Sequence, residues 1–240
     1  MPTYTSSGIP VTTASVPLYP IAFPAYRPSR SNPNPAAMIR AKMAQIYDRY
    51  RREIDQAVQL TNVPRELIQA IIFTESSGNA SVSVPPVSAT GLMQITPGTA
   101  DGMIFIEKSK GRLLQQEAAI CQKYLGSRLN GILQQKYLMH KIPANRNTGR
   151  TVTVADLKNP EFNILIGAIT LGLLIDEFTE AGVVRLDKVH LRYNQGWFYK
   201  VVPGSPEAVL AQARKRGTEA YNNLLKHLGV NGTLHCLMTA

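Results

Sequence analysis

The chain has 240 residues, of which 44% are hydrophobic. This is enough for one ordinary domain with an appendage, or two small domains, and it excludes a chain that is disordered throughout. Lys and Arg number 26 against 16 Asp and Glu, so the formal net charge is +10 and a polyanion is the favoured partner. Nucleic acid, anionic cell-wall polymer and an acidic membrane all satisfy this charge.

Composition also bears on metals and membranes. The two cysteines, Cys121 and Cys236, are too few for a disulfide-dense scaffold or a Cys-rich zinc site. The four histidines are scattered without ligand spacing, so we expect no metal and no cofactor. The longest apolar run, 164–175, is shorter than the roughly 20 residues that a bilayer requires, which predicts a buried helix and no transmembrane segment.

Residues 1–15 contain neither a basic segment nor a continuous apolar segment, so we expect no secretion signal and synthesis in a cytoplasm. Both cysteines are then expected to be reduced, with a pairing between them as the alternative.

Residues 1–35 form a separate block that holds eight of the 16 prolines and only two charges, Arg27 and Arg30. Proline removes backbone donors and fixes φ, which disfavours both helices and central strands. The block is either a disordered tail or an extended arm that lies on a partner subunit. In the second case its anchors are aromatic: Tyr4, Tyr19, Phe23 and Tyr26.

The rest of the chain, 36–240, has the pattern of a mainly α domain. Apolar residues spaced by three or four predict a helix of about 23 residues: Ile39, Met43, Ile46, Tyr50, Ile54 and Ala57. Pro64 suits the first position of a second helix, which Gly78 ends. Further helix starts are predicted where a capping residue precedes proline, at Thr96-Pro97, Asn159-Pro160 and Ser205-Pro206. Residues 150–154 offer the single strand candidate.

Glu75 is the sharpest chemical feature. It lies four residues after Ile71 and eight after Leu67, on the apolar face of the second helix. Burial there raises the pKa of a carboxyl group, and the helix C-terminus disfavours its anion further. A protonated Glu is what a glycosidase needs as its general acid. The alternative is a Glu just past the helix end that points into water.

Four sequence blocks occur in a fixed order with Glu75. Residues 75–79 read ESSGN, 91–100 read GLMQITPGTA, 159–164 read NPEFNI with Gly167 following, and 193–196 read YNQG. Together they resemble the soluble lytic transglycosylase (SLT) family, whose fold is lysozyme-like and whose blocks are ESSGN, GLMQ, NPE-x-NI and AYNAG. The resemblance covers about residues 55–230.

The resemblance implies roles for the first two blocks. Glu75 matches the catalytic acid, and Met93 and Gln94 match the loop that lines the saccharide groove. Gln94 is suited to hydrogen-bond an N-acetyl group, and Met93 to form an apolar floor beneath a sugar ring. The alternative for both is a core turn after Gly91.

The other matched residues are expected to bind substrate. Tyr193 and Asn194 match the YN of the last block, where the Tyr hydroxyl would orient the catalytic carboxyl; the alternative is a buried structural Tyr. Ser83 matches the Ser between the first two blocks, and Ser88 competes with it because the intervening loop is about one residue longer than usual.

The chain departs from the family at three places. Gln195 replaces a small residue, and Thr170 stands where an aromatic residue is usual. Residues 101–158 form a longer segment with 10 Lys and Arg against four Asp and Glu, and its apolar spacing predicts an added helix around 113–125. This insertion either grips the wall or a neighbouring subunit, or is a solvated lobe.

No second carboxylate follows Glu75 closely. The nearest are Asp101 and Glu107, and Asp55 lies on another helix. The resemblance implies a lytic transglycosylase, in which one acid cleaves peptidoglycan glycan strands and leaves 1,6-anhydroMurNAc without metal. The alternatives are a hydrolytic muramidase of the goose-lysozyme type and a non-catalytic structural protein. Nucleic-acid binding would rest on charge alone, since no binding motif is present.

The expected localisation is a phage virion, from which the enzyme would open the host wall at infection. The arm, 1–35, would dock on tail or portal proteins. The alternative is a bacterial secretion or conjugation machine.

Overall fold

A computed structural model describes residues 4–5, 8–10, 35–85, 89–134, 151–180, 182–196, 199–229 and 232–234. The described chain is mainly helical, as predicted. Its helices are α1 (Pro35–Thr61), α2 (Arg65–Ser76), α3 (Pro97–Ser109), α4 (Gln115–Leu125), α5 (Arg128–Leu133), α6 (Val154–Leu157), α7 (Pro160–Glu177), α8 (Leu186–Gln195), α9 (Pro206–Arg216) and α10 (Thr218–Leu228). Its strands form three antiparallel pairs: β1 (Tyr4–Thr5) with β2 (Gly8–Pro10), β3 (Ser83–Val84) with β4 (Ala89–Thr90), and β5 (Thr179–Glu180) with β6 (Val183–Val184).

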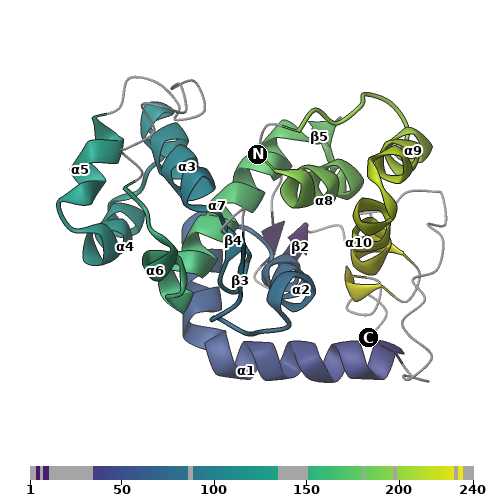
Figure 1. The fold of residues 1–240 in the computed structure, drawn as a ribbon, viewed down its shortest axis with the longest axis horizontal. Coiled ribbons are helices and arrows are strands. Elements are labelled where there is room, and N and C mark those ends of the chain that lie inside the picture. The colour runs from purple at the N-terminus through teal and green to yellow at the C-terminus, as the bar shows by residue number, and fades with distance from the viewer. Residues whose placement is uncertain are drawn as a thin grey trace.

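Helix α7 is the centre of the fold. It is apolar on all sides and buried along nearly its whole length, as expected for a helix surrounded by protein. It packs against α1, α3, α4, α6 and α8. Figure 1 shows α7 between a group formed by α3, α4 and α5 and a second group formed by α8, α9 and α10. The run 164–175 is thus a buried helix, and no described helix is long and apolar enough to cross a membrane.

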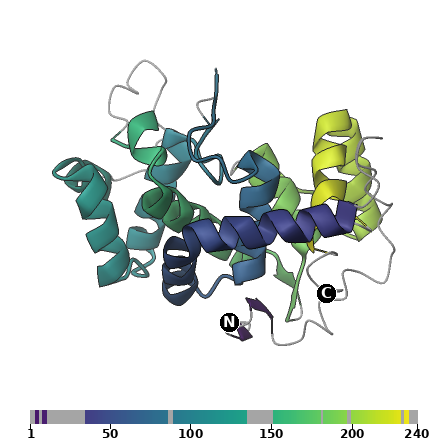
Figure 2. The same cartoon turned by 90° about the horizontal axis from the view of Figure 1, so that it is seen from below.

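The predicted starts of α1 and α2 are confirmed to within a residue. Pro64 occupies the N-cap of α2, one position before the expected one. Helix α1 is kinked at Tyr50, whose φ of −122° and ψ of 24° are not helical; Figure 2 shows the two segments that meet there. The Tyr50 hydroxyl donates to the carbonyl of Gly78 at 3.0 Å, so the kink of α1 is tied to the turn that follows α2.

Proline starts three further helices as predicted, after the N-caps Thr96, Asn159 and Ser205. The strand prediction for 150–154 is wrong for its described part, because 151–153 are irregular and α6 begins at Val154. The cause is Asp101, whose carboxylate accepts hydrogen bonds from the backbone N–H groups of Thr151 and Val152. A partner strand would otherwise have to satisfy these donors.

The insertion contains the expected added helix, which is α4 and begins at Gln115. Its basic side chains form several ion pairs inside the domain: Arg112 with Glu107 and Asp176, Lys123 with Glu161, and Arg128 with Asp156. These charges stabilise the packing of the insertion on α6 and α7. Whether the insertion also grips the wall stays a prediction.

Most of the predicted arm lies outside the described residues. Its described part is the β1–β2 pair, and β2 lies beside α2 (Figure 1). Helix α1 begins at Pro35, at the predicted end of the arm.

Candidate active site

Glu75 lies in the last turn of α2 and follows the buried residues Leu67, Ile68 and Ile71 along this helix. Glu75 is partly exposed as a whole residue, while its carboxyl group is buried. Burial is the main reason that its pKa is raised to about 7, and the charge of Glu219 acts in the same direction. The charge of Lys226 and a hydrogen bond with Asn194 oppose this rise. Glu75 therefore has the raised pKa expected of a desolvated acid.

The loop of residues 91–94 is folded tightly on itself. Gly91 has a φ of 80°, and a Cβ there would lie 2.4 Å from the carbonyl oxygen of Leu157, so the position requires glycine. Gln94 also has a positive φ, of 48°. Its amide nitrogen donates to the carbonyl of Gly91 at 2.8 Å and closes the loop. Gln94 is partly exposed as a whole residue, and its expected contact with an N-acetyl group stays a prediction.

Asn163, in the first turns of α7, fixes this loop from beneath. Its side-chain oxygen accepts from the N–H of Met93 at 2.8 Å. Its side-chain nitrogen donates to the carbonyls of Thr90 at 2.8 Å and Leu157 at 2.9 Å. Asn163 is fully buried, so these three bonds satisfy polar groups that have no access to water. The NPEFNI block thus positions the GLMQ block.

Met93 differs from the expectation. Its side chain is 0% exposed and packs against Gly167 of α7, where a Cβ would lie 2.3 Å from the Met93 sulfur. A floor in direct contact with a sugar ring requires exposure, which Met93 does not have here. Its role in this structure is to seat the loop on α7.

Tyr193 and Asn194 come from α8 and approach both the loop and the acid. The Tyr193 hydroxyl donates to the carbonyl of Met93 at 2.8 Å. Burial, and then the charge of Glu75, raise the pKa of Tyr193 well above its usual range. The Asn194 side chain lowers the pKa of Glu75 and the charge of Glu75 raises that of Tyr193, so both predicted residues of this block lie near the acid.

Gln195 extends the contact with Glu75 outward. Its amide nitrogen donates to Asn194 Oδ1 at 2.7 Å, and its amide oxygen accepts from Arg216 Nε at 2.8 Å. The NH₂ group of Asn194 is the part of that amide that can donate to the Glu75 carboxylate. We call the series Arg216, Gln195, Asn194 and Glu75 the amide relay. It depends on the residue that departs from the family pattern.

Ser83 lies on β3, and its hydroxyl is 3.1 Å from that of Thr90 across the hairpin. Ser88 lies outside the described residues. Thr170 is buried in α7, where its hydroxyl donates to the carbonyl of Ile166 at 2.8 Å.

The acids considered in the sequence are engaged elsewhere: Asp55 with Arg65, Asp101 with Thr151, and Glu107 with Arg112. Sequence reasoning missed Glu219 and Lys226, both on α10, whose charges act on Glu75. Their spacing of seven residues puts them on one face of an amphipathic helix. That spacing was the available signal, but it does not reveal that α10 packs against α2.

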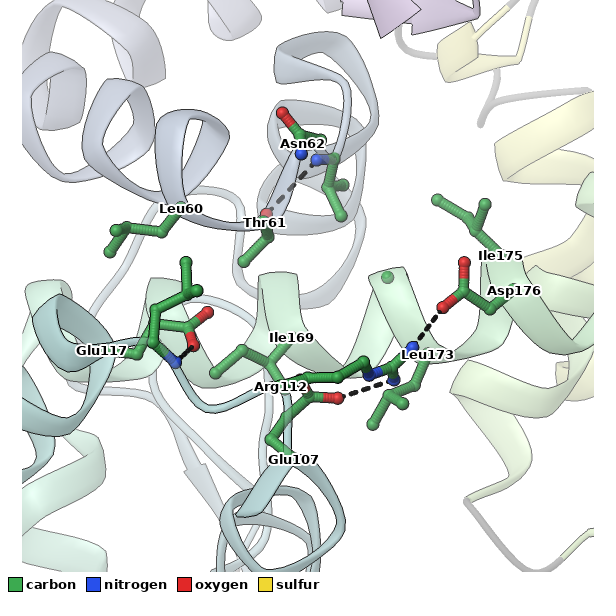
Figure 3. A pocket seen from close by; sticks show the side chains of 13 residues that line it. Leu60, Thr61, Asn62, Glu107, Arg112, Glu117, Ile169, Leu173, Ile175 and Asp176 are labelled. Atoms are coloured by element: carbon green, nitrogen blue, oxygen red, sulfur yellow. Dashed lines mark hydrogen bonds and ion pairs between the residues drawn. The ribbon is translucent and has the colours of Figure 1, made fainter. Parts of the chain in front are cut away.

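A separate cavity of about 540 Å³ lies where the α1–α2 junction meets α7 and the α3–α4 connection. Figure 3 shows Arg112 along this cavity, with its guanidinium between Glu107 and Asp176. None of the predicted site residues lines it.

No group of three or more potential metal ligands occurs among the described residues. Cys121 is a buried free thiol, and burial raises its pKa to about 12, so it is not a reactive nucleophile. Cys236 lies outside the described part of the chain.

Residues 52–140 match the family model of the transglycosylase SLT domain. The match contains Glu75, Ser83, Met93 and Gln94, while the blocks at 159–167 and 193–196 lie beyond it and reach the matched segment through α7 and α8. Comparisons with curated proteins and with solved structures found no match. The described chain is thus mainly α, and residues 52–140 are similar to the transglycosylase SLT domain, a lysozyme-like domain.

Proposed function

We propose that the protein is a peptidoglycan lytic transglycosylase that cleaves the β-1,4 bond between MurNAc and GlcNAc and forms 1,6-anhydroMurNAc. The observation that carries this proposal is Glu75, whose pKa of about 7 and contact with Asn194 suit one group that acts as acid and then as base. The match to the SLT domain supports the same substrate class.

The reaction uses Glu75 twice. Protonated Glu75 gives its proton to the glycosidic oxygen as the bond to MurNAc C1 breaks, and the substrate's N-acetyl group stabilises the positive centre at C1. The Glu75 carboxylate, which accepts a hydrogen bond from Asn194, then takes the proton of the MurNAc C6 hydroxyl while that oxygen bonds to C1. Glu75 ends protonated, and no water is consumed.

A hydrolytic muramidase is the second candidate, and Glu219 favours it. Most glycosidases use two carboxylates, and the second activates water or acts as a nucleophile. Glu219 is an exposed carboxylate near enough to raise the pKa of Glu75. A non-catalytic structural protein is less consistent with the convergence of Glu75, Tyr193 and Asn194.

Mass spectrometry of digested sacculi separates these functions. A lytic transglycosylase releases anhydromuropeptides, which are lighter by one water than hydrolytic products. A product with reducing MurNAc ends only would identify the muramidase, provided that the Glu219→Gln variant no longer releases it. If the full chain releases no muropeptides at all, the non-catalytic structural protein is the remaining candidate.

We further propose that a phage virion delivers the enzyme to the host periplasm and wall, with residues 1–35 as the docking arm for tail or portal proteins. The support is the proline-rich, nearly uncharged composition of this block. A segment that orders on binding can wrap a large surface despite its entropy cost. A secretion or conjugation machine is the alternative carrier.

The delivery proposal is tested by deleting residues 1–34, which leaves α1 intact. We expect wall cleavage within a few-fold of the full chain and loss of the protein from purified particles. If the truncated protein is incorporated into particles normally, residues 1–35 are only a tail and not a docking arm. Loss of cleavage would mean that the β1–β2 pair beside α2 supports the active site.

A further inference from the structure

Helix α10 places a cation at the end of α2, beside Glu75. Lys226 Nζ donates to the carbonyl of Thr74, the residue before Glu75, at 2.9 Å. The ammonium also lies 5.5 Å from the centre of the Phe73 ring. Lys226 is partly buried. It interacts with three consecutive residues in the last turn of α2: with the ring of Phe73, with the carbonyl of Thr74 and with the charge of Glu75.

This position opposes the two effects that disfavour a Glu75 carboxylate. The carbonyls at the C-terminus of α2 carry the negative end of the helix dipole, and Lys226 bonds one of them. The positive charge also attracts the carboxylate through a partly desolvated environment, where charge interactions are stronger than in water. Burial of Lys226 lowers its own pKa and Glu75 raises it, so the coupling between the two groups is mutual.

Glu219 provides the opposite charge from the same helix face. It is in the first turn of α10, and Lys226 is in the last turn. Glu219 disfavours the Glu75 carboxylate, and Lys226 favours it. The other polar groups near Glu75 are Tyr193 and Asn194 from α8, with Arg216 one step further along the amide relay.

Two buried histidines lie on α8 and α10, the two helices that carry Asn194 and Lys226. His190 of α8 and His227 of α10 stack with ring centres 4.1 Å apart. Burial lowers the pKa of both, so both are neutral when Glu75 titrates. They therefore do not contribute a changing charge near pH 7.

We propose that Lys226 is a positioning residue for Glu75: from its site on the Thr74 carbonyl, its ammonium stabilises the carboxylate that Glu75 becomes between its two proton transfers, and Glu219 limits this stabilisation. The inference rests on the proposed function for its catalytic meaning. Its electrostatic content is independent of that function. Without Lys226, Glu75 remains protonated to higher pH and is a weaker acid in the first proton transfer, because the carboxylate formed there is less stabilised.

The test uses the full chain with four substitutions to compare, and a fifth to assign the NMR signal. Lys226→Met retains the aliphatic length but removes the charge, Lys226→Arg retains the charge, and Glu219→Gln removes the opposing charge. The matched control is Lys215→Met, which makes the same charge change on the exposed face of α9. The direct readout is the titration of the Glu75 carboxyl carbon by NMR on protein labelled with ¹³C-Glu, with the signal assigned by its absence in Glu75→Gln. The second readout is the pH profile of muropeptide release at low salt, where charge interactions are least screened.

In Lys226→Met we expect the Glu75 titration and the alkaline limb of the release profile to move up by about 1 pH unit, since a nearby opposite charge lowers a carboxyl pKa by roughly that much or more. In Glu219→Gln both should move down, by less, because Glu219 is exposed. Lys226→Arg and Lys215→Met should stay at the wild-type values.

A Lys226→Met variant whose Glu75 titration stays in place while its rate or melting temperature falls would overturn the proposal and leave Lys226 as a helix cap. If Lys226→Met does not fold, an unmoved titration in Glu219→Gln, together with a moved one in Lys226→Arg, overturns it equally. Expected titration shifts in a protein that releases no anhydromuropeptide would contradict the proposed function while supporting the role of Lys226.

Discussion

The hydroxyl of Tyr193 donates a 2.8 Å hydrogen bond to the carbonyl oxygen of Met93, across 100 residues of sequence. Met93 is held from two more directions, by Asn163 at its N–H and by Gly167 at its sulfur. Three of the four sequence blocks therefore meet at one buried residue. Asn194, next to Tyr193, contacts Glu75 of the remaining block. The blocks form one structural unit that holds the acid in a defined place.

Replacing the acid should abolish release of muropeptides. Glu75→Gln keeps the shape but cannot donate a proton, and general acid catalysis contributes roughly 10²–10⁴-fold to a rate. We expect a loss of that size with an unchanged melting temperature. Glu66→Gln is the matched control, because Glu66 is also a partly buried acid of α2 but lies in its first turn. Digestion of sacculi at near wild-type rate by Glu75→Gln would remove Glu75 as the acid.

Substitutions of two glycines in α7 test the packing of Met93 against this helix. A Cβ on Gly167 would lie 2.3 Å from the Met93 sulfur, whereas a Cβ on Gly172 would meet Val63 at an ordinary 3.5 Å. Overpacking costs typically 1–3 kcal/mol, so Gly167→Ala should lower the free energy of unfolding by about that amount and also lower activity by shifting the loop.

Gly172→Ala should be neutral or stabilising by up to about 1 kcal/mol, because alanine is the better helix former. Urea unfolding of both variants measures the difference. Equal stabilities would mean that the Met93 side chain relocates without cost and does not fix the loop.

The helices were predictable where the sequence contains local instructions. Thr96-Pro97 and Asn159-Pro160 start helices by capping and by the fixed φ of proline, and both effects act within a few residues. The strand predicted at 150–154 does not form, because Asp101, about 50 residues away in sequence, accepts the hydrogen bonds of its backbone donors. No local pattern contains such a partner.

The same distinction holds at the candidate site. The position of Glu75 on an apolar face indicated burial and a raised pKa. The resemblance indicated the block that contains Asn194. Lys226 and Glu219 were missed because their effect on Glu75 depends on the packing of α10 against α2, which residue spacing does not specify. For Met93 the sequence left an apolar floor and a core turn open, because the loop pattern does not distinguish a side chain that faces substrate from one that faces α7.

The amide relay predicts a role for Gln195. In Gln195→Ala, Asn194 Oδ1 loses its donor, and the Asn194 amide is free to turn away from Glu75. We expect a several-fold fall in the rate of muropeptide release with little change in stability, since the Gln195 side chain is only partly buried. The double variant with Asn194→Ala should lose little more than Asn194→Ala alone, because residues of one network are not additive. Full additivity would show that Gln195 acts without Asn194.

The stacked histidines predict loss of stability in acid. Burial lowers the pKa of His190 to about 3 and that of His227 well below its usual value, so the folded protein holds both rings neutral. The unfolded chain binds protons on these rings below a pH of about 6.5, whereas the folded chain does not. Their contribution to stability is therefore complete above that pH and is lost progressively as the pH falls below about 6.5.

Each ring lowers the free energy of unfolding by up to about 1.4 kcal/mol per pH unit across that range. Urea unfolding at a series of pH values measures the slope in the wild type and in His190→Phe, which keeps an aromatic ring in the stack but cannot bind a proton. We expect the variant to show about half the slope. It should be at least as stable at neutral pH, because both ring nitrogens of His190 are buried without a hydrogen-bond partner in the described part of the chain, and an unmet buried polar group costs roughly 1–3 kcal/mol. Identical slopes for the two proteins would mean that His190 gains a proton without unfolding, and that acid lability comes from other groups.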